Sequence, residues 1–128
     1  MYTDYDSYRS PAGLKVLGEQ GGEWFEVAGN CYAAHFYEHS DIKLKTNIET
    51  INTSDNIPQL KQFNWKSDRS RSYGLIAQEL EEMGYSELVD NSGEHKTVKY
   101  SAALSLIVGK LQVKIKELEK EIEILKNK

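Results

Sequence analysis

The clearest pattern of apolar and polar positions lies in the last third of the chain. Apolar residues recur there at alternating spacings of four and three residues, with charged residues between them. This is the heptad spacing of a coiled-coil helix, and it predicts such a helix over about residues 101–127. The apolar seam of the predicted coil consists of Leu104, Val108, Leu111, Ile115, Leu118, Ile122 and Leu125.

The charged residues that flank the seam indicate how the helices associate. Lys114 and Glu121 occupy g positions of the heptad, and Glu119 and Lys126 occupy the e positions that follow them. In a parallel, in-register coil each of these g residues meets an e residue of opposite charge on the neighbouring helix. The pattern therefore predicts parallel association of identical chains. The alternative is a single amphipathic helix packed on its own domain.

The number of chains in the coil is left open by the seam. β-Branched residues at position a with leucine at position d favour two strands in model coils. Ile107 stands at a g position and widens the apolar face at the start of the seam, which suits a larger bundle. Periodicity alone does not choose between a dimer and a larger assembly.

Shorter elements are expected in the middle of the chain, where apolar segments alternate with turn-forming residues. A short helix after Ser40 has Ser40 or Asp41 as its N-cap and apolar residues at helical spacing. The remaining predicted elements are a strand at 63–66 with a hairpin tip at 67–72, a helix at 74–83 that ends at Gly84, and a hairpin of 88–89 with 97–98 around a turn at 90–93.

Residues 1–39 have a different character. Aromatic and β-branched runs at 24–28 and 31–37 flank a Gly-Asn turn, which predicts short strands. Neither run alternates cleanly enough to define one buried face. We therefore expect these strands to pair with other chains, as at the end of a β-rich fibre shaft.

Composition narrows the class of protein. At 128 residues, with 39% apolar and 28% charged residues, the chain is too small for a large enzyme core and suits an elongated protein that buries surface between subunits. The net charge of −4 argues against a nucleic-acid partner. No run is apolar and long enough to predict a membrane-spanning helix, and no signal peptide is evident at the start. We expect synthesis in the cytoplasm and no membrane partner.

Few residues suggest a metal or cofactor site. Cys31 is the only cysteine, so neither an intrachain disulfide nor a cysteine-based zinc site can form. His35 and His39 have the spacing of a metal-binding pair on a helix, but no third ligand is evident. We therefore expect no metal and no organic cofactor.

Four short segments occur together in a specific order: SDIKLKTNI at 40–48, FNWK at 63–66, GLIAQEL at 74–80 and VKY at 98–100. Together they resemble the endosialidase-type intramolecular chaperone, or peptidase S74 domain, of phage endosialidases, tailspikes and tail fibres. The resemblance covers residues 40–128. Lys43 stands where this family commonly has arginine, which keeps the charge but loses a forked contact.

The resemblance implies self-cleavage between His39 and Ser40 by a dyad of Ser40 and Lys45. Ser40 is the expected nucleophile and Lys45 the expected base, because an alcohol attacks poorly until a neighbouring base removes its proton. Lysine acts as a base only when it is neutral, and removal from water favours the neutral form. A packed trimer interface could remove Lys45 from water, so cleavage is expected to follow assembly.

The expected architecture is mainly α with small β-hairpins: a homotrimer joined by a parallel helical bundle, with a β shaft end at 1–39 and a chaperone domain at 40–128. The expected function is an intramolecular chaperone that registers a phage tail fibre or tailspike, its folding client, and releases itself as a single-turnover serine peptidase. The alternative is a permanent trimerisation or attachment cap that does not cut. The resemblance places the passenger in the phage virion tail, after synthesis and processing in the bacterial cytoplasm.

Overall fold

A computed structural model of the chain describes residues 26–128, and the chain divides into two units. The first unit, Met1–Lys45, is described from residue 26 onward. The element found in this described part is η2, a 3-10 turn over Ile42–Leu44. The Lys43 amide donates a hydrogen bond of 2.9 Å to the Asp41 carboxylate, which caps the turn. One of the two expected N-caps is thereby confirmed.

The short helix expected after Ser40 is a single 3-10 turn that ends at Leu44, so it does not extend to Ile48 and Ile51 as the apolar spacing suggested. Lys45 already has extended backbone (φ −119°, ψ 150°), and Asn47 is left-handed (φ 51°). A short helix depends on burying its apolar face, and both Leu44 and Ile48 remain exposed. Spacing that suits a helix was therefore not sufficient to form one.

The β shaft predicted for residues 1–39 lies mostly outside the described part of the chain, which begins at residue 26. The run at 24–28 crosses that boundary. Residues 26–39 are exposed and form no strand in the single chain. Because the expected strands depend on pairing with other chains, the shaft stays a prediction.

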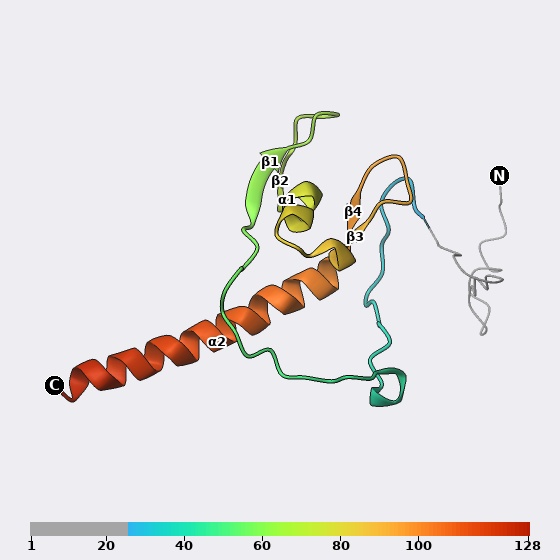
Figure 1. Cartoon of the computed structure of the whole chain (residues 1–128). Helices are drawn as coiled ribbons and strands as arrows, with labels where there is room; N and C mark the ends of the chain where they lie inside the picture. Colours follow the sequence, from blue (N-terminus) through green and yellow to red (C-terminus); the bar gives the residue numbers. More distant parts are fainter. Residues whose placement is uncertain (1–25) are drawn as a thin grey trace, which may run out of the picture. The chain divides into compact units, whose positions relative to one another are not determined.

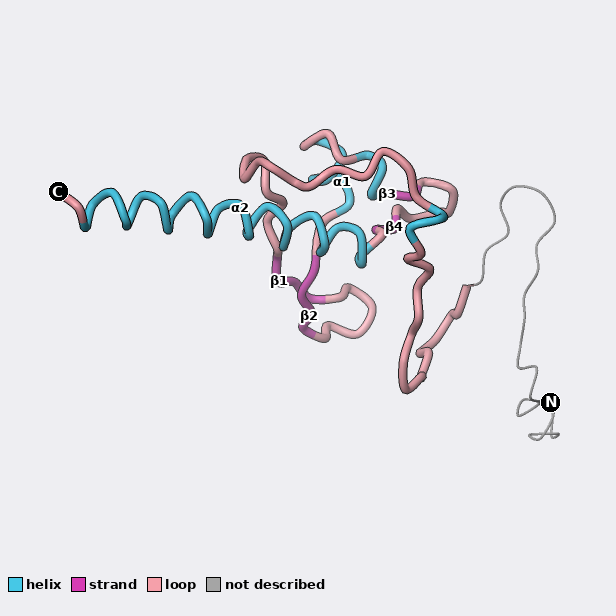
Figure 2. Tube along the Cα trace, turned by 90° about the horizontal axis from the view of Figure 1, so that it is seen from below, coloured by secondary structure: helices cyan, strands magenta, loops and turns pink. Residues whose placement is uncertain are grey.

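The second unit, Thr46–Lys128, contains two antiparallel hairpins, a short helix, a 3-10 turn and a long helix. Its elements are β1 (Lys61–Asn64), β2 (Arg71–Gly74), α1 (Ala77–Glu82), η3 (Ser86–Leu88), β3 (Val89–Asp90), β4 (Thr97–Val98) and α2 (Tyr100–Lys126). Within this unit the hairpins and α1 lie along the first half of α2, and the second half extends beyond them (Figures 1 and 2). The hairpins and helices expected in this unit are present, but the first strand ends at Asn64, residues 71–74 form β2, and the helix expected from Gly74 begins at Ala77.

Short-range hydrogen bonds close both hairpins. In the β1–β2 tip the Trp65 amide donates to the Ser70 carbonyl (2.9 Å), and the Ser70 amide donates to the Asp68 carboxylate (2.9 Å). In the β3–β4 turn the Ser92 amide donates to the Asp90 carboxylate at 2.8 Å. These hydrogen bonds lower the pKa of both aspartates. The turns follow from local chemistry, as the sequence predicted.

The β3–β4 hairpin is also tied to α1 by polar contacts. Asn91 donates a hydrogen bond to the Glu81 carboxylate (3.1 Å), and Lys96 forms an ion pair with it (3.1 Å). Both partners lower the pKa of Glu81. These exposed contacts orient the hairpin more than they stabilise it.

The apolar core of the second unit is small and lies where α1, η3 and β3 meet the first half of α2. Leu80 is its most completely buried large side chain. The buried apolar residues are Leu75, Ala77, Leu80, Leu88, Val89, Ala103 and Ile107. Ile107 is only 5% exposed, so it belongs to this core and does not widen the seam, which corrects the sequence analysis. A residue at the edge of a seam can equally face the helix's own domain.

We expect Leu80→Ala to lower the free energy of unfolding by about 2–5 kcal/mol, because it leaves a cavity in the buried core. Urea denaturation followed by circular dichroism measures this change. Ile48→Ala is the matched control, since Ile48 is exposed and its truncation should change stability by less than about 0.5 kcal/mol. Equal effects of the two substitutions would contradict the assignment of the core.

Candidate functional site

Ser40 and Lys45 are in direct contact in the first unit. Lys45 Nζ donates a hydrogen bond to Ser40 Oγ at 2.8 Å. The η2 turn makes this contact possible, because backbone bonds from Leu44 to Asp41 (3.0 Å) and from Lys45 to Ile42 (3.1 Å) turn the chain back on itself. The two residues named by the family resemblance are therefore neighbours within one chain.

The geometry of this pair suits proton transfer. A separation of 2.8 Å is within the range in which a base can take a proton from a nucleophile. In the arrangement described, the lysine donates to the hydroxyl, whereas catalysis needs a neutral lysine that accepts. Both side chains are exposed to water in the single chain. The two side chains are in contact, but they are not shielded from water, as activation of the lysine would require.

The histidines near the expected cleavage site do not gather other ligands. His35 contacts the ring of Tyr37 with a centroid separation of 6.1 Å, and His39 is exposed. Across residues 26–128 there is no group of at least three His, Cys, Asp or Glu side chains arranged to hold a metal. In the same residues no helix has the length and apolarity needed to cross a membrane.

The predicted seam lies along a side of α2 that is free of the chain's own domain. Its seven side chains, Leu104 to Leu125, keep between 42% and 66% of their surface exposed. The domain instead packs against Ala103, Ile107 and Lys110, which are buried. In the described structure the seam therefore does not serve as the contact between α2 and its own domain.

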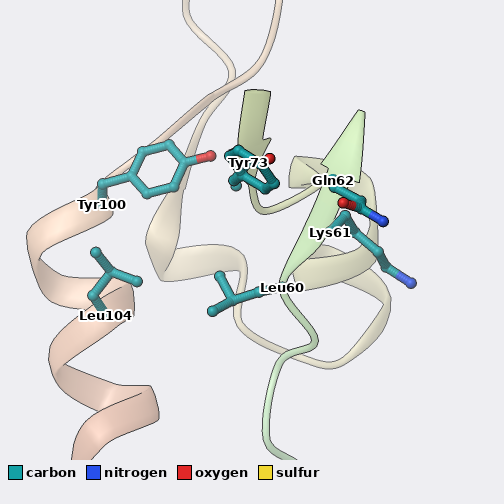
Figure 3. Close-up of a pocket in the computed structure, with 7 residues that line it drawn as sticks. Leu60, Lys61, Gln62, Tyr73, Tyr100 and Leu104 are labelled. Atoms are coloured by element: carbon teal, nitrogen blue, oxygen red, sulfur yellow. The ribbon is translucent and has the colours of Figure 1, made fainter. Parts of the chain in front are cut away.

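An apolar groove adjoins the first residue of the seam (Figure 3). It has a volume of about 560 Å³, and its lining includes Leu60, Tyr73, Tyr100 and Leu104. The Leu75 amide donates a hydrogen bond of 2.9 Å to the Tyr100 hydroxyl. Leu104 belongs to both the groove and the seam, so the exposed apolar surface is continuous from the β1–β2 hairpin to α2.

Lys110 was not singled out by the sequence analysis. It is the buried charged residue of the described chain, at 7% exposure. Its Nζ donates a hydrogen bond to Thr53 Oγ1 (3.1 Å) and lies 3.5 Å from Asp55 Oδ1. Lysine at a heptad c position is ordinarily solvated, and its partners lie far away in the sequence. The local sequence pattern therefore did not indicate that Lys110 is buried.

Comparison with known families supports the resemblance found in the sequence. Residues 40–90 match the family model described as chaperone of endosialidase, Peptidase_S74. Residues 40–90 thus match an endosialidase-type chaperone domain. The match begins at Ser40 and ends at Asp90, in β3. Searches of curated proteins and of solved structures gave no match.

The family match supports two coarse statements about this chain. Its description supports a chaperone role, and its peptidase name implies a self-cleaving domain of the serine type. The matched range starts at the serine whose hydroxyl contacts Lys45. The expected roles of Ser40 and Lys45 remain predictions.

Proposed function

We propose that this chain is a self-releasing intramolecular chaperone. It assembles as a parallel trimer through α2, brings the upstream chains of a phage tail fibre or tailspike into register, and then cuts itself between His39 and Ser40. The observation that carries the proposal is the 2.8 Å hydrogen bond between Lys45 Nζ and Ser40 Oγ, at the first residue of the family match.

The chemistry begins with an acyl shift onto Ser40. Neutral Lys45 takes the hydroxyl proton while Ser40 Oγ attacks the carbonyl carbon of His39. The C–N bond between His39 and Ser40 then breaks, and the protonated lysine returns its proton to the departing amine. One water molecule hydrolyses the resulting ester, which leaves a carboxyl group on His39 and restores the hydroxyl of Ser40. In the net reaction one water molecule is consumed and one peptide bond is broken.

The exposure of the dyad supports a dependence of cleavage on assembly. Ser40 and Lys45 are hydrogen-bonded yet accessible to water in the single chain. Burial against a neighbouring subunit would disfavour the charged lysine and so supply the base. Cleavage therefore waits for the trimer without a separate sensor.

The apolar surface of α2 supports association of identical chains. The seam and the adjoining groove expose apolar residues that soluble monomers rarely leave in one continuous patch. The charges at Lys114, Glu119, Glu121 and Lys126 match in a parallel, in-register coil. The seam pattern by itself suits a dimer, and the choice of a trimer rests on the family resemblance.

A trimeric clamp addresses a specific difficulty of β-rich fibres. Strands from different chains pair slowly, and a shift by one residue turns each side chain to the wrong face. A clamp that assembles first fixes the register of the upstream segments. Cleavage then makes the folding of these segments kinetically irreversible. In this proposal the passenger becomes part of the virion tail after processing in the host cytoplasm.

Wild-type protein is expected to separate into residues 1–39 and residues 40–128, which intact-mass spectrometry distinguishes in one spectrum. The larger product should begin with a free amine on Ser40. Wild type that remains intact as a trimer after prolonged incubation would contradict self-cleavage and favour a permanent, non-cutting cap.

A further inference from the structure

Residues 51–57 form a segment, here called the strap, that crosses α2 within the second unit (Figure 1). Its first residue, Ile51, is joined to Lys45 through residues 46–50. Its last residue, Ile57, packs against the apolar core. Asn56 near that end donates a hydrogen bond to the Met83 carbonyl at 2.9 Å. The end of the strap is therefore anchored by contacts other than those of Lys110.

Lys110 fastens the middle of the strap to α2. Its Nζ donates to Thr53 Oγ1 (3.1 Å) and pairs with Asp55 Oδ1 (3.5 Å), while its own side chain is 9% exposed. A hydrogen bond from Thr53, a backbone hydrogen bond and the charge of Lys110 lower the pKa of the Asp55 carboxyl. Asp55 is thus ionised at neutral pH. A buried ammonium needs such partners, so the lysine and the strap hold each other in place.

Two further contacts extend along the helix. Ile51 packs directly on Gly109, where a Cβ atom would collide with the Ile51 side chain. Ser54 Oγ donates a hydrogen bond of 2.5 Å to Glu117 Oε1. All three helix positions that contact the strap belong to heptad sites b and c, whereas the seam uses a and d. The strap and a neighbouring helix can therefore occupy α2 together.

We propose that Lys110 is a positioning residue for self-cleavage, because it fastens the tether of the dyad to the helix that joins the subunits. This inference rests on the proposed self-cleavage. With the strap fastened, only residues 46–50 are free between Lys45 and the second unit's contacts. Release of the strap would roughly double the length of the free tether. Each doubling of a flexible segment costs about 0.6 kcal/mol of chain entropy, so the end of the tether would reach any one position about threefold less often.

The first test is the cleavage rate of the full chain, followed by intact mass over time. Lys110→Met should cut about threefold or more slowly than wild type, at wild-type trimer mass in light scattering. Lys110→Arg should recover most of the rate, because it restores a buried cation that can bond Thr53 and Asp55. Lys116→Met is the matched control, since Lys116 is an exposed lysine of the same helix, and it should cut normally.

A second variant guards against loss of folding. Asp55→Asn changes a side chain that is 80% exposed and removes only its charge, so it should fold normally and slow cleavage to a smaller extent. In an uncleavable Ser40→Ala background, Lys110→Met should speed amide hydrogen exchange in residues 51–57 and leave α1 unchanged. This exchange change separates a released strap from a general loss of stability.

The outcomes separate this inference from the proposed function. Wild type that never cuts overturns both. Wild type that cuts while Lys110→Met cuts at the same rate overturns only the role of Lys110. Slower cleavage with unchanged exchange in residues 51–57 also overturns it, because the strap would then have stayed in place.

Discussion

Lys45→Arg is expected to abolish self-cleavage while leaving the trimer intact. Arginine keeps the positive charge and a donor that can reach Ser40, but its guanidinium stays protonated and cannot act as a base. Loss of a general base typically lowers the rate by about 10²–10⁴-fold. Ser40→Ala should give the same loss by removing the nucleophile. Intact-mass spectrometry after incubation should then find full-length chain.

Lys43→Arg is the matched control for this prediction. It also replaces a lysine with arginine, two residues before Lys45. Lys43 contributes its backbone amide to the turn and takes no part in the hydrogen bond between Ser40 and Lys45. It should cut normally. Cleavage of Lys45→Arg at the wild-type rate would show that Lys45 is not the base.

Leu118→Asp is expected to prevent assembly and, as a consequence, cleavage. Leu118 lies in the middle of the seam and is exposed in the single chain, so the substitution should spare the domain's own core. In the coil it would bury a carboxylate without a partner in every subunit. Light scattering should find monomers, and the cut fraction should fall towards that of Lys45→Arg. Ile115→Asp should behave in the same way.

Ile124→Asp offers a control on the same helix. Ile124 is also exposed and apolar, but it stands at a heptad c position away from the seam. This variant should remain trimeric and should cut. Trimers of Leu118→Asp at wild-type mass would contradict a coil centred on this seam, and a dimeric wild type would contradict the trimer.

Local chemistry explains which elements could be predicted from sequence. The β3–β4 hairpin follows from Asp90 and Ser92, whose hydrogen bond closes the turn within two residues. The start of η2 likewise follows from the cap at Asp41. The short helix expected after Ser40 forms only one turn, because further turns would need a surface on which to bury Leu44 and Ile48, and neither is buried.

Contacts between distant residues were harder to predict. The neighbours Ser40 and Lys45 were identified through the family resemblance, and the turn between them makes their contact local. Thr53 and Lys110 are 57 residues apart, and nothing in either local pattern indicates the other. Ile107 was misassigned for a related reason. On a helix with two apolar faces, the apolar residues of both faces repeat with the same helical period. Spacing alone therefore does not tell which face meets the chain's own core.

The placement of the buried apolar residues has a consequence for how this part of the gene can be exchanged. In the described chain all of them lie between Leu75 and Ile107, on one side of the bond between His39 and Ser40. Breaking that bond removes none of them, so the released piece keeps its complete core. Under the proposed function, an exchange of coding sequence ahead of Ser40 would likewise change the client of the chaperone and leave the described core unaltered.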